Sequence, residues 1–248
     1  MNQISFFDAN CMIGRWPGSR LWFSTAVELA QEMKYYHIEK ALVYHSWAWQ
    51  YDPEKGNAQL LREIKGHKNL FPVMVIAPWQ IPQQILSKET RELIKTKAYG
   101  VKLFPKDHNY SLCSWNFKEI FKFLEKIHLP VFINYNQVDM NNFAEILSLY
   151  PHLPFILCET SYSLGRMLFS LLNSFSNLYF EISTFLCYEG IEEVCARFGA
   201  QRVLFGSAMP FLDPGGSLAR LLYSTISEKD RKRIAGTNLE RLISGIKR

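Results

Sequence analysis

The stretch Gly100-Val101-Lys102-Leu103-Phe104 is followed by the segment Phe117–Ile127 and then by Pro130-Val131-Phe132-Ile133-Asn134. The first and last of these segments are short apolar runs, which are typical of buried parallel strands. The middle segment repeats apolar side chains at spacings of three and four, which predicts a helix with one buried face. This region therefore predicts a strand, a helix and a second strand parallel to the first.

The same alternation extends over the whole chain. The other apolar runs are Ile4–Ala9, Ala41–His45, Phe71–Ala77, Pro154–Cys158, Leu178–Ile182 and Arg202–Gly206. Further helices are expected from Thr25, with Glu28 completing a capping box, to Tyr36, over Asn57–Ile64 and Pro82–Lys95, after Asp139 as a cap, and over Leu164–Leu172, Ile191–Phe198, Leu218–Tyr223 and Glu228–Ile243. Eight such strand and helix units close naturally into a (β/α)8 barrel, so we predict an α/β protein with a single domain over residues 1–248.

The composition excludes several other classes of protein. Of the 248 residues, 48% are hydrophobic and 15% aromatic, which is too many for a disordered chain. The best apolar run, Leu70–Trp79, is ten residues long and contains two prolines, so no membrane-spanning helix is expected. No secretory signal is visible after Met1, and the five cysteines form no CxxC pair, so we expect a cytoplasmic protein.

The net charge of +5 comes largely from the C-terminal end of the chain. Residues 228–248 contain seven Lys or Arg residues and three Asp or Glu residues. Such a segment could bind nucleic acid, or it could be the solvated face of a C-terminal helix. No nucleic-acid-binding motif accompanies it, so we expect no nucleic-acid partner.

Polar side chains gather where the predicted strands end. In a (β/α)8 barrel the C-terminal ends of the strands form the mouth that carries the functional site. Asp8, Asn10 and Met12 share a parity in the first strand and should face the same way. The other candidates, in chain order, are His45, Trp47, Trp49 and Tyr51, Lys102 and Phe104, Asn134 and Asn136, Glu159, Ser183, Ser207 and Ala208.

The order and spacing of these segments resemble the amidohydrolase superfamily, specifically its amidohydrolase-related branch of metal-dependent hydrolases and decarboxylases. The segments that carry the resemblance are Phe7–Gly14, Gly100–Pro105, Leu129–Asn134, Pro154–Glu159, Arg202–Pro210 and Ile234–Leu239. Together they span nearly the whole chain.

The resemblance implies metal-binding positions at which this chain carries other residues. The His-x-His pair of the first strand is replaced by Asn10 and Met12, the histidines of the fourth, fifth and sixth strands by Phe104, Asn134 and Glu159, and the aspartate after the last strand by Ala208. Amides and thioethers are poor zinc ligands, and alanine can neither bind a metal nor accept a proton. We therefore expect no cofactor and no metal. The alternative is a divalent metal such as zinc at a non-standard site of Asp8, His45 and Glu159.

Two hypotheses about function follow. In the first, the protein is catalytically silent or metal-independent and keeps the mouth of the barrel to bind a small molecule, or keeps the barrel for assembly with a partner or a second copy. In the second, it is an active hydrolase or decarboxylase on a small carboxylate- or lactone-bearing substrate, comparable to a metal-free lactonase branch of the superfamily. Glu159 would act as the base while Lys102 and His45 polarise a carbonyl. The substrate contacts would then come from Asp8, Asn10, Asn134, Asn136, Trp47, Ser183 and Ser207.

Each of these features also has a purely structural interpretation. Lys102 and Glu159 could form an ion pair that fills the mouth, and His45 could be a hydrogen-bonded structural residue. The aromatic segment Trp47–Tyr51 could cover a ligand or pack on neighbouring helices or a partner subunit. The segment Asp213–Ser217 could cradle phosphate, or form a turn in which Ser217 caps the next helix. The sequence contains neither HExxH nor GxSxG, so the zinc-protease and serine-hydrolase templates do not apply.

Overall fold

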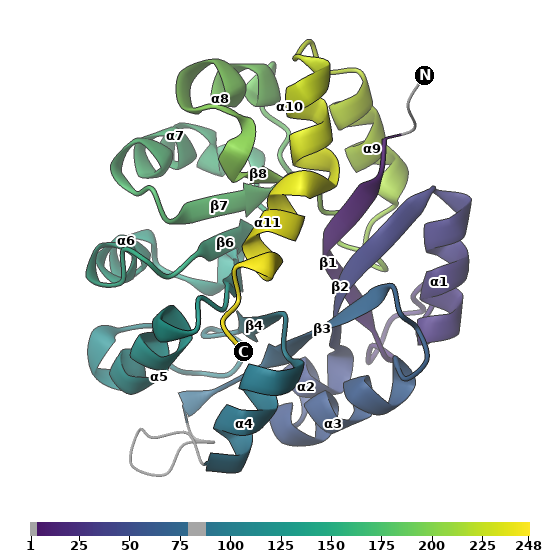
Figure 1. Cartoon of the computed structure of the whole chain (residues 1–248), viewed down its shortest axis with the longest axis vertical. Coiled ribbons are helices and arrows are strands. Elements are labelled where there is room, and N and C mark those ends of the chain that lie inside the picture. Colours follow the sequence, from purple (N-terminus) through teal and green to yellow (C-terminus); the bar gives the residue numbers. More distant parts are fainter. Residues whose placement is uncertain (1–3, 79–87) are drawn as a thin grey trace.

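Eight parallel strands follow one another in chain order around a barrel in a computed structural model that describes residues 4–78 and 88–248 (Figure 1). The strands are β1 (Phe6–Ile13), β2 (Ile38–His45), β3 (Leu70–Val75), β4 (Gly100–Leu103), β5 (Val131–Asn134), β6 (Phe155–Cys158), β7 (Leu178–Glu181) and β8 (Val203–Leu204). The last strand returns to the first through hydrogen bonds from Ala9 N to Phe205 O (3.0 Å) and from Met12 N to Met209 O (2.8 Å). The predicted (β/α)8 barrel is confirmed.

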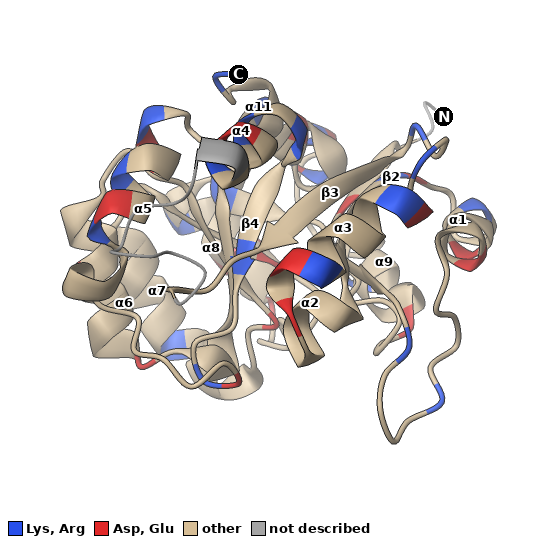
Figure 2. Cartoon of the chain, turned by 90° about the horizontal axis from the view of Figure 1, so that it is seen from below, with Lys and Arg blue, Asp and Glu red and all other residues tan. Residues whose placement is uncertain are grey.

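Helices form a ring outside the strands. They are α1 (Ala26–Tyr35), α2 (Ser46–Gln50), α3 (Pro53–Glu63), α4 (Lys88–Lys97), α5 (Ser114–Lys126), α6 (Met140–Leu149), α7 (Gly165–Ser174), α8 (Gly190–Phe198), α9 (Pro214–Leu222), α10 (Glu228–Lys232) and α11 (Asn238–Ser244). A helix is expected over Pro82–Lys95, and its residues before Lys88 lie outside the described part of the chain. In Figure 2, basic and acidic segments are interspersed on these outer helices.

Local sequence explains where several helices begin. The capping box of α1 is present: Glu28 N donates to Thr25 Oγ1 at 3.2 Å, and Thr25 N donates to Glu28 Oε2 at 3.0 Å. Asp139 caps α6 by accepting hydrogen bonds from the backbone N–H groups of Asn141 and Asn142. The apolar face of α5 is buried against the barrel, as its spacing predicts.

Two segments near the mouth differ from what the sequence indicates. The segment after β2 is a short helix, α2, because His45 Nδ1 accepts a hydrogen bond from Trp47 N (3.0 Å) and caps it. The cap of α9 is Asp213 rather than Ser217, since Asp213 directly precedes Pro214 at the first helical position and accepts a hydrogen bond from Gly215 N (2.6 Å).

The helix expected over Glu228–Ile243 is divided into α10, a π-helical turn over Arg233–Thr237, and α11. In the turn, Ile234 O accepts a hydrogen bond from Phe205 N at 2.9 Å, which ties this carbonyl to the end of β8. Some basic side chains of this region form hydrogen bonds within the protein and do not only face the solvent. Arg231 Nη2, for example, donates to Ser224 O at 2.7 Å.

Apolar side chains form an inner and an outer core. The inner core fills the barrel, and Leu239 and Leu242 of α11 are part of it. The outer core lies between the strands and the helices. None of the described helices is long and apolar enough to cross a membrane. The polar side chains at the mouth therefore stand on a barrel that is packed on both of its faces.

Candidate functional site

A cluster of buried polar side chains lies at the C-terminal ends of five strands. Its members are Asn10 of β1, Lys102 of β4, Asn134 of β5, Glu159 directly after β6 and Glu181 of β7. All except Glu159 are almost completely buried, and Glu159 is partly exposed. Buried polar groups are stable only when they are hydrogen-bonded, and these five residues bond to one another.

Asn10 connects the positive and negative charges of the cluster. Its Oδ1 accepts a hydrogen bond from Lys102 Nζ at 2.7 Å, and its Nδ2 lies 3.4 Å from Oε1 of both Glu159 and Glu181. Among the described residues, no carboxylate oxygen lies within 4 Å of Lys102 Nζ. The amide therefore stands between the charges, and the direct ion pair between Lys102 and Glu159 is not formed.

Aromatic rings surround the Lys102 ammonium. Its Nζ lies 4.5 Å from the centroid of the Tyr44 ring and 5.8 Å from that of Phe104. The faces of both rings attract a cation, and this attraction stabilises the position of the ammonium in the buried site. Burial raises the pKa of Tyr44 well above its ordinary value, and the negative charge of Glu159 raises it further. Tyr44 is therefore a neutral phenol at neutral pH.

Glu181 fixes the backbone that carries Glu159. Its Oε1 accepts hydrogen bonds from Glu159 N and Ser183 Oγ, both at 2.7 Å, and its Oε2 accepts one from Ser183 N at 2.5 Å. Glu159 has a φ of 53°, a left-handed conformation that costs a non-glycine residue free energy unless its surroundings hold it. Burial raises the pKa of Glu181 above its ordinary value. Sequence reasoning missed Glu181, although a carboxylate at the end of the apolar run 178–182 was a usable signal.

Asp8 and Ser207 lie in the seam between β1 and β8. Asp8 Oδ1 accepts hydrogen bonds from Asn10 N and Ser207 N, both at 3.0 Å, and Ser207 Oγ accepts one from Met209 N at 3.1 Å. Asp8 is fully buried, and burial raises its pKa. The pairing of β1 with β2 shifts register between Asp8 and Cys11, so the parity that predicted a common direction for Asp8 and Asn10 is broken.

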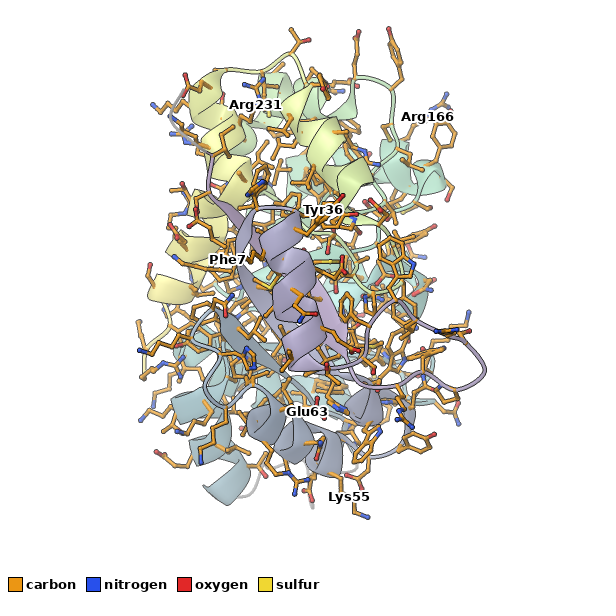
Figure 3. All side chains as sticks on the ribbon, turned by 90° about the vertical axis from the view of Figure 1, so that its right-hand side faces the viewer. Phe7, Tyr36, Lys55, Glu63, Arg166 and Arg231 are labelled. Carbon is orange, nitrogen blue, oxygen red and sulfur yellow. The ribbon has the colours of Figure 1, made fainter. Side chains whose placement is uncertain are left out.

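Three residues predicted for the site are not brought to this cluster. In β2 the side chain of Tyr44 faces the barrel interior, so the next residue, His45, faces outward. There its Nε2 lies 3.3 Å from Glu63 Oε1 on α3, which Figure 3 labels, and burial lowers its pKa. Asn136 is exposed on the turn after β5, and Trp47 is 44% exposed on α2.

A layer of aromatic rings covers the cluster. Trp49 stacks on Phe104 with ring centroids 4.2 Å apart and an interplanar angle of 10°, and its Nε1 donates to Asp107 Oδ2 at 2.7 Å. Trp16 lies 4.7 Å from Trp49 and 5.0 Å from Phe211, measured between centroids. Trp49, not Trp47, is therefore the residue of the aromatic segment that lies over the mouth.

Two side chains at positions where the resemblance implies metal ligands are hydrogen-bonded within the cluster. The described residues contain no group of three or more His, Cys, Asp or Glu side chains placed to hold a metal. At these positions, Asn10 Oδ1 accepts a hydrogen bond from Lys102 Nζ at 2.7 Å, and Asn134 Nδ2 donates one to Glu159 Oε1 at 2.8 Å. Amide N–H groups that point at the carboxylate occupy directions a metal would need.

The overall shape of the chain matches several solved structures at low sequence identity. They include an uncharacterised TIM-barrel protein from Bordetella bronchiseptica (16% identity, TM-score 0.76, covering 97% of this chain and 99% of that one) and 2,6-dihydroxybenzoate decarboxylase from Rhizobium (15%, 0.76, 98% and 99%). A third is dihydroxybenzoic acid decarboxylase from Polaromonas, with bound manganese and the inhibitor 2-nitroresorcinol (14%, 0.79, 98% and 97%). At such low sequence identities, the structural similarity shows only that this chain and these proteins share a fold.

A comparison with curated protein sequences finds no match. A family model described as amidohydrolase matches residues 13–244, which is nearly the whole chain and includes all of β2 to β8 but only Ile13 of β1. The resemblance carried by the segments from Gly100 to Leu239 agrees with this match. The chain therefore belongs to the amidohydrolase family.

Proposed function

We propose that this protein binds a small polar molecule at the mouth of its barrel without a catalytic metal, and that the Lys102 ammonium provides the positive charge of the site. The observation that carries this proposal is the 2.7 Å hydrogen bond from Lys102 Nζ to Asn10 Oδ1. The resemblance implies that Asn10 stands at the position of a first-strand metal ligand, and here a cation of the protein itself binds that side chain. A metal added beside a buried ammonium would meet strong repulsion.

Some hydrogen-bonding groups of the cluster have no partner in the described part of the chain, which supports the proposal that a ligand binds there. An ammonium has three donors, and Asn134 Oδ1 is a buried acceptor without a hydrogen-bond partner in the described part of the chain. An unpartnered buried polar atom is costly, and a ligand or a water can satisfy it. A small molecule with both a hydrogen-bond donor and an acceptor matches this arrangement. Because Trp49 lies over the mouth, a ligand could reach the cluster only if this ring moved or left room beside it.

The test of the proposal is the metal content of protein purified without chelator. We expect well under one zinc, manganese or iron atom per chain by elemental analysis, and the same thermal midpoint with excess Mn²⁺ or with a chelator. Stoichiometric metal whose removal lowers the midpoint would overturn the proposal.

A second candidate is metal-independent hydrolysis or decarboxylation at the same cluster. Glu159 favours it, because Glu159 is the one carboxylate among Asp8, Glu159 and Glu181 that reaches solvent. In ester or lactone hydrolysis, Glu159 would take a proton from the attacking water while Lys102 stabilises the oxyanion that develops on the carbonyl. His45 has no part in this version, since it lies outside the barrel.

Turnover of a panel of esters, lactones and small carboxylates, assayed for hydrolysis and for release of carbon dioxide, distinguishes the two candidates. Binding alone predicts no turnover by the parent protein. Catalysis predicts turnover that falls at least about a hundredfold in Glu159→Gln, as expected for loss of a general base. The matched control is Glu145→Gln, since Glu145 is an exposed glutamate of α6 and should not affect the reaction. Equal turnover by Glu159→Gln and the parent would remove Glu159 as the base.

A further inference from the structure

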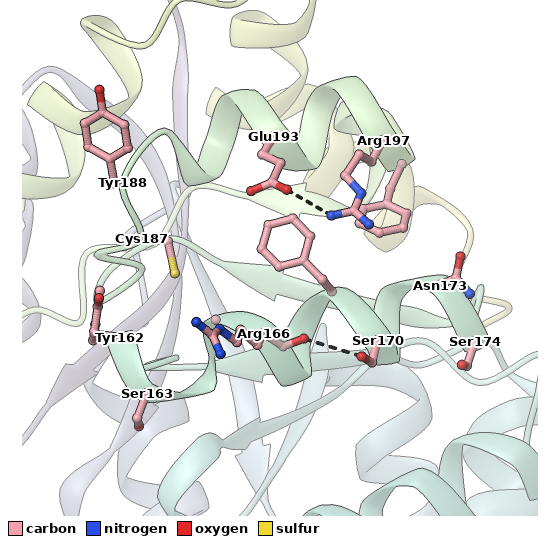
Figure 4. A pocket seen from close by; sticks show the side chains of 13 residues that line it. Tyr162, Ser163, Arg166, Ser170, Asn173, Ser174, Cys187, Tyr188, Glu193 and Arg197 are labelled. Atoms are coloured by element: carbon pink, nitrogen blue, oxygen red, sulfur yellow. Dashed lines mark hydrogen bonds and ion pairs between the residues drawn. The ribbon is translucent and has the colours of Figure 1, made fainter.

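We propose that a hollow between α7 and α8, on the outside of the barrel, binds a small amphipathic anion. The hollow has a volume of about 870 Å³. Pockets for small ligands usually have about 300–1,000 Å³. Figure 4 shows the side chains that line it, among them Tyr162, Arg166, Phe169, Tyr188, Glu193 and Arg197. No member of the cluster at the barrel mouth is among them, so this inference does not depend on the proposed function.

Polar side chains from both helices line the hollow, together with Phe169 of α7 and Phe198 of α8. On α7, Arg166, Phe169, Ser170 and Asn173 follow the spacing of one helix face, and all four line the hollow. Neighbouring helices of a barrel normally fill the space between them with apolar side chains. Here three of the four positions are polar, and Phe169 alone supplies an apolar surface from α7. These exposed polar side chains offer hydrogen-bonding groups to a ligand along the α7 side of the hollow.

The charge of the hollow is positive at one end. Arg197 Nη1 lies 2.9 Å from Glu193 Oε1, so these two charges compensate each other. Arg166 has no carboxylate within 4 Å among the described residues, and it is exposed. It lies in the first turn of α7, which begins at Gly165 without a side-chain cap. The positive end of the helix dipole therefore adds to its charge, and an anionic group is expected there.

Aromatic rings provide the apolar part of the lining. The Arg197 guanidinium lies 5.3 Å from the centroid of Phe169, so this ring forms part of the floor between the helices. Tyr162 and Tyr188, which are 73% and 87% exposed, stand at the same end as Arg166. Exposed rings beside a guanidinium suit a ligand with a flat apolar body and one anionic head, such as an aryl sulfonate, carboxylate or phosphate.

Two related fluorescent probes test this site. Anilinonaphthalene sulfonate is an amphipathic anion, and N-phenylnaphthylamine has nearly the same rings without the charge. We expect the sulfonate to bind at one site per chain and Arg166→Gln to weaken its affinity about tenfold, as for the loss of a charge-assisted hydrogen bond. The uncharged probe should be affected by less than about twofold, because only the anionic head contacts Arg166.

Three further variants locate the probe. Ser170→Trp places a large side chain in the hollow and should weaken both probes, and circular dichroism checks that this exposed position tolerates the change. Arg62→Gln removes an exposed arginine from α3 and should leave both affinities unchanged. Lys102→Met should also leave them unchanged. The proposal is overturned if Arg166→Gln has no effect, if Arg62→Gln has the same effect, or if Lys102→Met rather than Ser170→Trp abolishes binding.

Discussion

At the scale of single residues, the buried carboxylate of Glu181 makes the stability of the fold depend on pH. Its pKa in the folded chain is raised above the ordinary value of 4.5, mainly by burial. Below pH 4.5 the carboxyl group is protonated in both the folded and the unfolded chain. As the pH rises from there, the unfolded chain releases its proton first, so the folded state loses stability until the folded pKa is passed.

Glu181→Gln should abolish this loss. We expect the free energy of unfolding of the parent, minus that of the variant, to decrease as the pH rises above 4.5, with a slope of up to about 1.4 kcal/mol per pH unit, the limit for one proton. Urea unfolding at a series of pH values measures it. Asp8 also has a raised pKa, but it is present in both proteins and its effect cancels in the difference. A difference that is constant over pH would contradict the prediction.

The members of the cluster differ in how well the sequence predicts them. Asn10, Lys102, Asn134 and Glu159 are predicted at the mouth, and the structure places them together because each lies in the C-terminal half of a strand or directly after one. His45 shows the limit of this reasoning. A one-residue error in the last inward position of a strand moves a side chain to the opposite face, and periodicity alone does not fix strand ends that closely. Tyr44, its neighbour, is the inward residue.

At the scale of secondary-structure elements, the sequence predicts the positions of the strands more accurately than those of the helices around the mouth. The eight apolar runs coincide with the eight strands because parallel strands buried on both faces require continuous apolar sequence. Helix α2 is five residues long, too short to show a 3.6-residue period, and its cap is a histidine ring nitrogen rather than a Ser, Thr, Asp or Asn oxygen. A helix as short as α2 therefore forms because of contacts that exist only in the folded barrel, and local sequence does not predict it.

Helix α2 carries two tryptophans with different expected contributions to stability. Trp49 stacks on Phe104 and donates a hydrogen bond to Asp107, whereas Trp47 is 44% exposed. Trp49→Ala should therefore lower the free energy of unfolding by about 2–4 kcal/mol, and Trp47→Ala by less than about 1 kcal/mol. Urea titrations followed by circular dichroism compare the two variants. Equal losses would mean that the aromatic layer over the mouth does not stabilise α2.

At the scale of the whole molecule, both ends of the described chain take part in closing the barrel. The first strand, β1, pairs with β8 through the seam that contains Asp8, and α11 packs Leu239 and Leu242 against the interior of the barrel. The backbone after α11 is also fixed, since Lys247 N donates to Ile127 O at 2.8 Å. These contacts join residues far apart in the sequence, so we expect the barrel to unfold as one unit.

Leu239→Ala tests this expectation. Leu239 is 1% exposed, and truncating a buried leucine costs about 2–5 kcal/mol, so the variant should show a single urea transition at a lower denaturant concentration. The control is Leu149→Ala on α6, where the leucine is 51% exposed and the expected loss is under about 1 kcal/mol. Hydrogen exchange should also become faster in β1 and β8, and not in α11 alone, because loss of the inner core weakens the whole barrel. Faster exchange confined to α11, or a second urea transition, would show instead that this helix unfolds independently of the strands.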